Sequence, residues 1–394
     1  MTTTNNNEHK KLNVPNSTDK GNAIRNVPHL RFPEFSGEWV SKTIGDIAPL
    51  QRGFDLPTGQ INNGKFPVVY SNGIMNYHSS YKCVAPGLIT GRSGTIGKFT
   101  YIEDGYYWPH NTSLWVTDFY DNNPKFIYYL YQTIRIEQYS TGSGVPTLNR
   151  NNVHRHKTFI PKLKEQNKIA TILSLLDERI ATQTKIIEDL KKLKSALIEK
   201  HYSQVKKRTT CIADLGESFS VGSLAKDDLT ETGKPCVIYG ELFTTYGEII
   251  TQIESHTNKT DGVILSKKED LLFPSSTTVD AMSLIAPSVI NVDGVILGGD
   301  MFGIHISPNF NAQYLSYYFN HIAKRQLAKY AKGSTIIHLH YTDIEKAKLF
   351  LPSLEEQNRM AKCLVSLDDK IKGENALLDL LNNQKAYLLY QMFI

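Results

Sequence analysis

The chain of 394 residues has few cysteines and no long apolar segment. Its four cysteines, Cys83, Cys211, Cys236 and Cys363, are scattered, without a CxxC pair or a histidine at ligand spacing, which argues against a zinc site and a disulfide framework. No run approaches the ~18 apolar residues that a transmembrane helix needs. The first seven residues are polar and lack the apolar core of a secretory signal, so we expect a cytoplasmic protein with reduced thiols.

The sequence also lacks the motifs of self-sufficient enzymes. It has no Asn/Asp-Pro-Pro-Tyr/Phe signature of an amino-methyltransferase, no GxSxG elbow and no HExxH helix. The glycine-rich segment 91–98 fails the P-loop spacing, and Phe99 stands where a Ser or Thr would bind magnesium. His338 and His340 lie on one face of an expected strand without a third ligand, which favours hydrogen bonding or phosphate contact over metal binding. We therefore expect no catalytic residue and no metal site.

Tyrosine and a modest positive charge are what the sequence does have. Eleven of the 21 tyrosines lie between Tyr70 and Tyr139, a concentration that suits either a recognition surface or a tyrosine-rich β core. The formal net charge of +5 permits nucleic-acid binding. Residues 38–160 hold eleven basic and eight acidic residues, whereas residues 206–350 hold fourteen basic and sixteen acidic ones. Bulk charge therefore does not predict DNA binding by the second half.

An internal repeat organises the chain. Residues 142–180 align without gaps to residues 333–371, with fifteen of 39 pairs identical. Weaker similarities precede this block, where 123–129 resembles 311–317 and 44–47 resembles 212–215, each in a slightly different register. Because a single core rarely grows past ~250–300 residues, two domains are expected. The repeat predicts that they share one frame and carry unlike inserts.

Each repeat ends in a long amphipathic segment. Its apolar residues recur at alternating steps of four and three, which is typical of a coiled coil. The polar interruptions also match, Gln183 with Glu374 and Lys194 with Lys385, which suggests that they set the register of a helix pair. Two helices packed on separate domains are the alternative, but independent helices have no reason to share their breaks. The predicted seam consists of Ile169, Leu173, Leu176, Ile180, Ile187, Leu190, Leu197, Met360, Leu364, Leu367, Ile371, Leu378, Leu381 and Leu388.

The two inserts are β-rich in pattern. Short apolar runs between Gly, Asn and Pro turns, such as 68–70 and 237–239, predict strands, and helices are expected over 124–139 and 311–330. The predicted fold class is α+β, with two globular domains, each followed by a long helix, and with the helices paired as an antiparallel coiled coil of pseudo-two-fold symmetry. The predicted boundaries are a disordered N-terminal tail over 1–28, a first domain over 29–160, a first helix over 161–205, a second domain over 206–351 and a second helix over 352–394.

Candidate DNA contacts come mainly from two segments. Segment 91–98 predicts a tight turn that exposes Arg92, Ser93 and Lys98 to a DNA backbone or base edge, unless it is only a hairpin. Segment 302–341 contains no acidic residue and several basic ones, which fits a phosphate-tracking surface or a solvated helix face. The full candidate set is Tyr70, Asn72, Arg92, Ser93, Lys98, Asn111, Ser143, Arg150, Lys324, Arg325, Lys332, Ser334 and His338.

Together these features resemble the specificity subunit, HsdS, of type I restriction-modification systems. The resemblance rests on LRFPEFSGEW at 30–39, ITGRSGTIG at 89–97, PKLKEQNKIA at 161–170 with its repeat at 352–361, and the ending QKAYLLYQMF. The second insert departs from this pattern, since it has no Gly-Arg-Ser-Gly turn and carries FPSST at 273–277 instead.

The resemblance implies a non-catalytic subunit with two target recognition domains, each of which reads one half of a bipartite site in double-stranded DNA. It implies two modification subunits that dock on the helices and methylate adenine N6, and restriction subunits that translocate and cleave DNA. S-adenosylmethionine, ATP and Mg²⁺ would belong to those partners, so this chain itself is expected to need no cofactor and to contact no membrane. The alternatives are a self-contained DNA-modifying or DNA-cleaving enzyme with duplicated β domains, and a scaffold without a DNA role.

Overall fold

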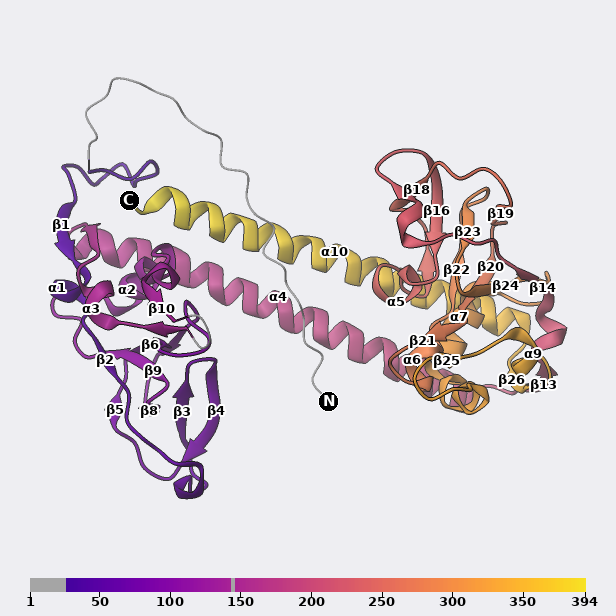
Figure 1. The fold of residues 1–394 in the computed structure, drawn as a ribbon, viewed down its shortest axis with the longest axis horizontal. Helices are drawn as coiled ribbons and strands as arrows, with labels where there is room; N and C mark the ends of the chain where they lie inside the picture. Colours follow the sequence, from indigo (N-terminus) through magenta and orange to yellow (C-terminus); the bar gives the residue numbers. More distant parts are fainter. Residues whose placement is uncertain (1–25, 143–145) are drawn as a thin grey trace. The chain divides into compact units, whose positions relative to one another are not determined.

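The structure, a computed structural model, describes residues 26–142 and 146–394 (Figure 1). The chain divides into unit 1, which runs to Ala181 and resumes over Asp379–Ile394, and unit 2, Thr182–Leu378. Helices α4 (Leu163–Gln204) and α10 (Leu354–Met392) each contribute one part to either unit. Each unit therefore contains one β-rich region and a stretch of both long helices.

The predicted N-terminal tail falls mostly outside the described residues, because residues 1–25 are not part of them. Its last residues are described. The carbonyl oxygen of Asn26 accepts a hydrogen bond from Trp39 N at 2.8 Å, and Pro28 is buried. The prediction of disorder is therefore wrong for residues 26–28, which pack on unit 1.

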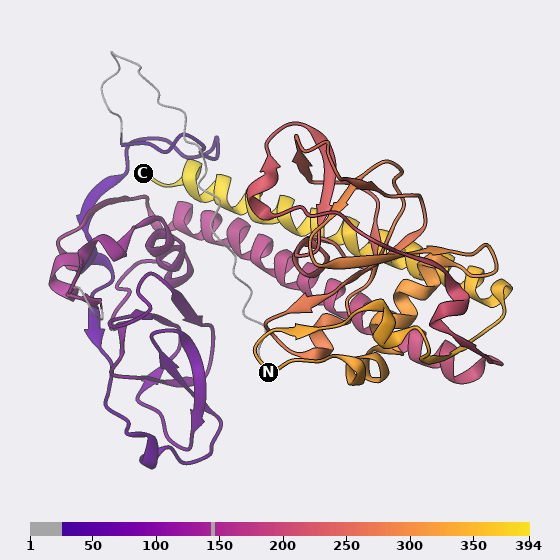
Figure 2. The same ribbon diagram turned by 45° about the vertical axis from the view of Figure 1, so that its right-hand side comes forward.

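Unit 1 contains two four-stranded sheets, and helix α2 (Pro124–Thr133) packs against the first one (Figure 2). Strand β6 is buried along its whole length because it lies between two neighbours of the first sheet. The first sheet has the strand order β2 (Leu50–Arg52), β9 (Ser113–Val116), β6 (Gly87–Gly91), β7 (Phe99–Ile102). The second sheet has the order β4 (Gly73–His78), β3 (Phe66–Tyr70), β8 (Tyr106–Pro109), β5 (Cys83–Val84).

The tyrosines of unit 1 occupy both its core and its surface. Tyr107, Tyr129 and Tyr131 are among the largest fully buried side chains. Tyr77 and Tyr106, in contrast, are exposed. A tyrosine core and a tyrosine-bearing surface therefore coexist in this unit.

Unit 2 contains two five-stranded sheets and helix α7 (Ala312–His321). The central strands β20 and β22 are buried throughout: Leu271, Phe273 and Val289 belong to the main core cluster together with α7, and Leu272 and Ile290 belong to a second cluster. The first sheet has the strand order β14 (Gly216–Ser220), β24 (Met301–Ile306), β20 (Asp270–Pro274), β22 (Ser288–Ile290), β17 (Ile249–Ile250). The second sheet has the order β15 (Leu229–Thr230), β18 (Ser255–Thr257), β16 (Lys234–Ile238), β23 (Ile296–Gly298), β19 (Ile264–Leu265).

Each insert is closed by an antiparallel strand pair, and the two pairs are equivalent in the repeat. In unit 1, β1 (Val40–Thr43) runs antiparallel to β12 (Lys157–Ile160). In unit 2, β13 (Arg208–Cys211) runs antiparallel to β26 (Lys348–Leu351). The register that aligns 44–47 with 212–215 also aligns β1 with β13, and the main repeat aligns β12 with β26. The closing strands are therefore part of the repeated frame.

The repeated Glu-Gln-Asn motif has a structural role at the start of each long helix. The Gln166 side chain donates a hydrogen bond to Pro161 O at 2.9 Å and accepts one from Asn123 N at 2.9 Å. Gln357 makes the corresponding bonds with Pro352 O and Asn311 N, at 2.9 and 3.0 Å. A buried glutamine in both units therefore ties the proline before the long helix to the N-cap of α2 or α7.

The long helices pair in antiparallel fashion, which confirms the predicted fold class. In unit 2, Gln183 donates to Glu374 O at 2.9 Å, and Lys194, farther along α4, reaches Asp368, which is earlier in α10. All the predicted seam residues are buried or half-buried. The residues at the matched polar breaks make hydrogen bonds or ion pairs with the opposite helix.

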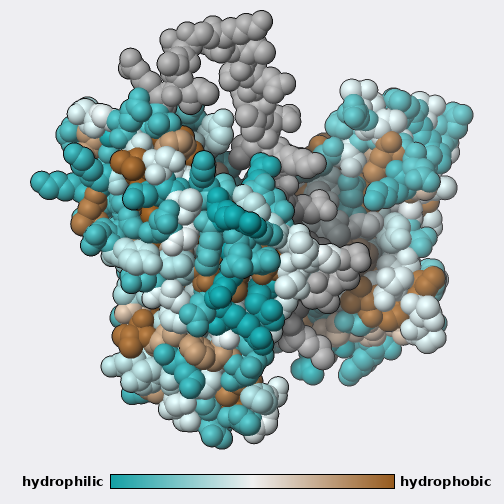
Figure 3. Space-filling model, turned by 60° about the vertical axis from the view of Figure 1, so that its left-hand side comes forward, coloured by the Kyte–Doolittle hydropathy of each residue, from teal (hydrophilic) through white to brown (hydrophobic). Residues whose placement is uncertain are grey.

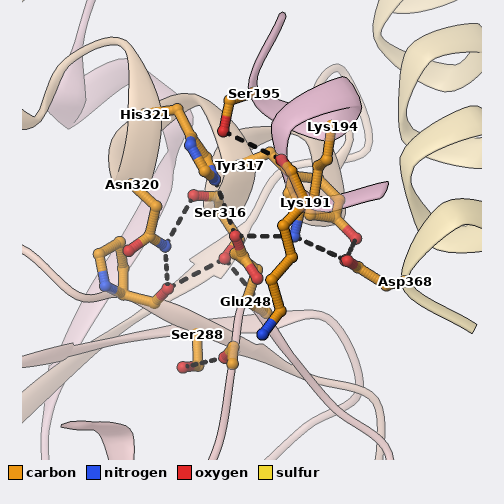
Figure 4. Close-up of polar contacts among 12 residues, drawn as sticks. Lys191, Lys194, Ser195, Glu248, Ser288, Ser316, Tyr317, Asn320, His321 and Asp368 are labelled. Carbon is orange, nitrogen blue, oxygen red and sulfur yellow. Dashed lines mark hydrogen bonds and ion pairs between the residues drawn. The ribbon is translucent and has the colours of Figure 1, made fainter. Parts of the chain in front are cut away.

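Only one pair of breaks meets directly. Lys194 forms ion pairs with Asp368 at 2.8 Å and with Glu248 at 3.0 Å (Figure 4), whereas Lys385 pairs with Asp177 at 2.6 Å within unit 1. In an antiparallel pair, a residue faces its own repeat equivalent only at the midpoint, which is where Gln183 lies. The matching of Lys194 with Lys385 thus reflects equivalent positions rather than contact.

The predicted helices over 124–139 and 311–330 are each interrupted. Helix α2 ends at Thr133 because Ile134 is extended, and a 3₁₀ turn follows over Ile136–Tyr139. In unit 2, α7 is followed by the short helix α8 (Lys324–Leu327) and a 3₁₀ turn over Ala328–Tyr330. No glycine or proline marks either break, so only tertiary packing determines them.

Two findings concern absent features. None of the helices within the described ranges is both long and apolar enough to cross a membrane. The four cysteines all belong to the described part of the chain and are free.

Candidate nucleic-acid interface

The glycine-rich turn of unit 1 follows strand β6. A Cβ atom on Gly91 would collide with Thr95 O, so only glycine fits there. Gly94 and Gly97 have positive φ angles of 80° and 85°, a conformation that glycine adopts without strain. The predicted tight turn is present, but Arg92 and Ser93 are half-buried rather than exposed, because neighbouring loops pack over them.

Arg92 is held by its backbone and by one side-chain nitrogen. Its N donates to Thr112 O at 2.8 Å, its O accepts from Leu148 N at 2.7 Å, and its Nε donates to Asn111 O at 3.0 Å. Within the described residues, the two Nη atoms have no protein partner. The guanidinium group is thus oriented by the protein while two of its donor nitrogens remain available to a ligand.

The other candidates of the first insert surround this turn. Lys98 Nζ donates to Asn72 O at 2.7 Å, and the Asn111 side chain donates to Asp55. The Tyr70 ring lies 4.2 Å from the His110 ring, measured between centroids. Burial lowers the pKa of His110, which favours its neutral form. The structure therefore gathers Tyr70, Asn72, Arg92, Ser93, Lys98 and Asn111 at one end of the unit 1 sheets.

The remaining candidates of unit 1 belong to a second loop beside the turn. Ser93 forms an isolated β-bridge with Thr147, and Gly94 N donates to Pro146 O at 3.2 Å. Arg150 is exposed at the first position of α3 (Arg150–His154). Ser143 lies outside the described residues.

The surface of unit 1 is largely polar on the face that Figure 3 turns forward, where hydrophobic side chains form small, separate groups. This composition suits a wet, polar interface better than a large apolar docking site.

The candidates of unit 2 lie on α8 and on a short hairpin after it. Lys324 is half-buried, and burial lowers its pKa, whereas Arg325 is exposed. Lys332 and His338 exchange backbone hydrogen bonds at 2.9 and 2.7 Å, with Ser334 exposed between them. His338 lines one cavity of about 670 Å³ with Lys324 and a second of about 420 Å³ with Lys332. Two of the other four candidates, Lys324 and Lys332, therefore share a cavity with His338.

The unit 2 site is not the purely basic surface that segment 302–341 suggested. Lys332 Nζ forms an ion pair with Asp343, and Asp300 and Asp343 line the smaller cavity with Lys332 and His338. The two carboxylates lie just outside the acid-free segment, which is why composition missed them. Asp300 aligns with Thr112 in the register that relates 311–317 to 123–129, but Thr112 was not itself a candidate, so the repeat alone did not point to Asp300.

The two histidines do not share a strand face, so that expectation is wrong. His338 belongs to β25 (Ile337–His338), whereas His340 is the N-cap residue of α9 (Tyr341–Ile344). Their rings are nearly parallel with centroids 6.1 Å apart. Among the residues described, no group of three His, Cys, Asp or Glu side chains could hold a metal ion.

The described residues thus form a duplicated frame that carries unlike loop sets at the ends of its sheets. The sequence profile described as "Type I restriction modification DNA specificity domain" matches residues 36–192 and 204–383. The chain therefore belongs to the family of type I restriction-modification specificity subunits.

Curated relatives agree with this assignment. The MjaVIII specificity subunit of Methanocaldococcus jannaschii is 24% identical over 274 residues, which cover 62% of this chain and 64% of the relative. The EcoprrI specificity subunit of Escherichia coli is 24% identical over 172 residues, 42% of either chain. The chain thus spans less than two thirds of the length of the curated relatives that it matches.

A solved structure shares the fold over nearly the full length. The type I S subunit from M. genitalium superposes with a TM-score of 0.66 at 17% identity, covering 93% of this chain and 99% of that one. A chain from a structural study of complex assembly in the type I R-M system gives a TM-score of 0.52 at 14% identity, covering 89% and 96%.

Proposed function

We propose that this chain is the DNA-reading subunit of a type I restriction-modification complex. The loop set of each unit reads one half of a bipartite site in double-stranded DNA, and the long helices dock two modification subunits. Those subunits supply the methyl transfer from S-adenosylmethionine, and restriction subunits supply ATP-dependent cleavage. The chain itself recognises DNA and catalyses no reaction.

One observation carries this proposal: the frame is the same in both units, but the side chains at the recognition loops differ. Unit 1 presents the donors Arg92, Lys98 and Asn111, whereas unit 2 presents Asp300 and His338 beside Lys332. Base edges in the major groove differ in their donor and acceptor pattern. Two unlike loop sets on one frame are what two unlike half-sites require.

The proposal is tested by exchanging one insert. Residues 40–158 are replaced by the corresponding insert of a relative, and the variant is expressed with its modification subunit. Single-molecule sequencing of the host genome then maps the methylated adenines. We expect one half of the motif to change and the other half to remain. A change in both halves, or in neither, would contradict the assignment of one half-site to each unit.

A second experiment separates recognition from catalysis. The purified chain alone is incubated with DNA and labelled S-adenosylmethionine, and in parallel with DNA and Mg²⁺. We expect neither methyl transfer nor cleavage, because the sequence carries no motif for either reaction. Activity that a point substitution in this chain abolishes would favour the self-contained enzyme instead.

A further inference from the structure

The loop set of unit 2 repeats that of unit 1 bond by bond, although the residues differ. In unit 1, Arg92 N donates to Thr112 O and Arg92 O accepts from Leu148 N, while Ser93 bridges to Thr147. These contacts define three positions: the turn residue, the residue before β9, and the strand residue across from the turn.

The same positions in unit 2 are occupied by Ser275, Asp300 and His338. Ser275 N donates to Asp300 O at 2.6 Å, and Ser275 O accepts from Leu339 N at 2.9 Å. Ser276 pairs with His338 in the β21–β25 ladder, where β21 is Ser276–Thr277. Ser275 therefore occupies the position of Arg92.

The sequence repeat supports this correspondence independently. In the ungapped alignment of 142–180 with 333–371, His338 and Leu339 fall on Thr147 and Leu148. In the register that relates 123–129 to 311–317, Asp300 falls on Thr112. Hydrogen bonds and sequence thus assign Asp300 to the same position.

This correspondence changes which hydrogen-bonding groups the equivalent positions present. Unit 1 offers the guanidinium of Arg92 and the amide of Asn111, whose equivalent in the same register is Gly299. Unit 2 offers instead the carboxylate of Asp300, which can only accept hydrogen bonds. A donor-rich site suits guanine O6 and N7, whereas an acceptor suits an exposed amino group.

The Asp300 carboxylate is exposed and oriented. Its Oδ2 accepts a hydrogen bond from Ser276 Oγ at 2.8 Å, and Oδ1 has no partner within the described residues. It lines the cavity of about 420 Å³ that also contains Lys332 and His338. Ser276 thus holds one oxygen of a carboxylate that lines the cavity, and the other oxygen has no partner among the described residues.

Resting on the proposed function, we infer that Asp300 reads a cytosine in the second half-site by accepting a hydrogen bond from its N4 amino group. Adenine also presents an amino group in the major groove, but its N7 acceptor lies beside it and repels a carboxylate. Cytosine has no such acceptor at that edge. Lys332 and His338 lie beside the carboxylate, where they can contact the neighbouring phosphates.

The test compares Asp300→Asn, Asp300→Ala and a control, Asp293→Asn, in complexes with the modification subunit. Asp293 precedes the first residue of β23, whereas Asp300 follows its last one. The Asp293 side chain accepts a hydrogen bond from Lys268 N, and an asparagine oxygen can accept the same bond. The readout is the methylated motif in cells that carry each variant. Asp300→Ala should lower the preference for cytosine at one position of the second half-site by about 5- to 150-fold.

Asp300→Asn should not only lower the preference for cytosine but also shift that position of the motif towards adenine, because an asparagine side chain can form two hydrogen bonds with adenine N6 and N7. It can still accept the bond from Ser276 Oγ, so it keeps the test valid if the alanine variant fails to fold. The first half-site and the motif of Asp293→Asn should stay unchanged. Wild-type motifs in both Asp300 variants, or loss of specificity in both half-sites, would overturn the inference.

Failure of the inference is distinguishable from failure of the proposed function. If the wild-type chain with its modification subunit yields no bipartite motif at all, the proposed function fails. If wild type yields a bipartite motif and the Asp300 variants share it, only the role of Asp300 fails.

Discussion

The two units attach their insert helices to the long helices in the same way, but unit 2 buries more charge in doing so. In unit 1, Tyr129 and Lys385 both contact Asp177, at 2.8 and 2.6 Å. In unit 2, Tyr317 and Lys194 contact Asp368 in the same manner. The repeated Tyr-Asp-Lys contact is therefore part of the frame and not of either recognition loop set.

Unit 2 extends this contact with two residues of its own insert. Glu248 accepts from Lys194 at 3.0 Å and lies 2.8 Å from His321 Nε2 (Figure 4). The residue of unit 1 that aligns with His321 is Thr133, which carries no charge. The Tyr-Asp-Lys contact is therefore common to both units, whereas the additional ion pair and hydrogen bond of Glu248 occur in unit 2.

The largest difference between the units should follow from removing the lysines. Lys194 is 8% exposed and forms ion pairs with two carboxylates, so Lys194→Met removes the positive charge that both share and should cost unit 2 about 3–5 kcal/mol. Lys385→Met removes a more exposed pair and should cost unit 1 about 1 kcal/mol.

Hydrogen exchange of peptides from α7 and α2 measures the opening free energy of each unit separately. Equal losses for the two lysine substitutions would contradict the difference in buried charge.

Gly91→Ala tests whether the turn of unit 1 requires glycine at a position where unit 2 has Pro274. The added Cβ displaces Thr95 O, which should destabilise the turn by about 1–3 kcal/mol and weaken recognition of the first half-site at least tenfold. Gly59→Ala is the matched control, because nothing lies within 4 Å of its Cβ position. Methylation mapping should show an intact second half-site, and loss of both halves would mean that the turn supports the whole complex.

The two basic residues at this turn should differ from each other. Arg92→Ala removes oriented base-edge donors and should cost about 1–3 kcal/mol of binding while relaxing one position of the first half-site. Lys98→Ala should weaken binding to all sequences alike and reduce the salt slope by about one. Gel shifts with the modification subunit, at several salt concentrations, check both effects. Wild-type binding and slope in both variants would make this turn purely structural.

The smallest effect is an acid sensitivity confined to unit 2. Burial favours a raised pKa for Glu248, but the hydrogen bond with His321 and the charge of Lys194 outweigh it and lower the pKa to about 2. A carboxyl group with a lowered folded pKa stabilises the fold above its ordinary value of 4.5, and this contribution is lost as the pH falls towards 2. Lowering the pH from 5 to 3 should therefore destabilise unit 2 more in wild type than in Glu248→Gln, which thermal unfolding at each pH measures. An equal slope in both proteins would exclude this role.

The helices and their seam could be predicted because their signal is local and periodic. The closing strands over 40–43 and 208–211 were not predicted, although one register of the repeat relates them to each other. The partners of Arg92 and Lys194 could not be predicted, because Thr112, Asn111, Glu248 and Asp368 are brought near by tertiary folding. The breaks after Thr133 and His321 were missed for the same reason, as no local residue type announces them.

Transplanting one insert into the other frame tests whether each insert alone determines its half-site. Because β1 and β12 match β13 and β26, residues 212–347 can be replaced by residues 44–156 at equivalent junctions. We expect the methylated motif of this chimera to contain the first half-site twice and to lack the second one. A chimera that assembles with the modification subunit and still methylates the wild-type motif would contradict it.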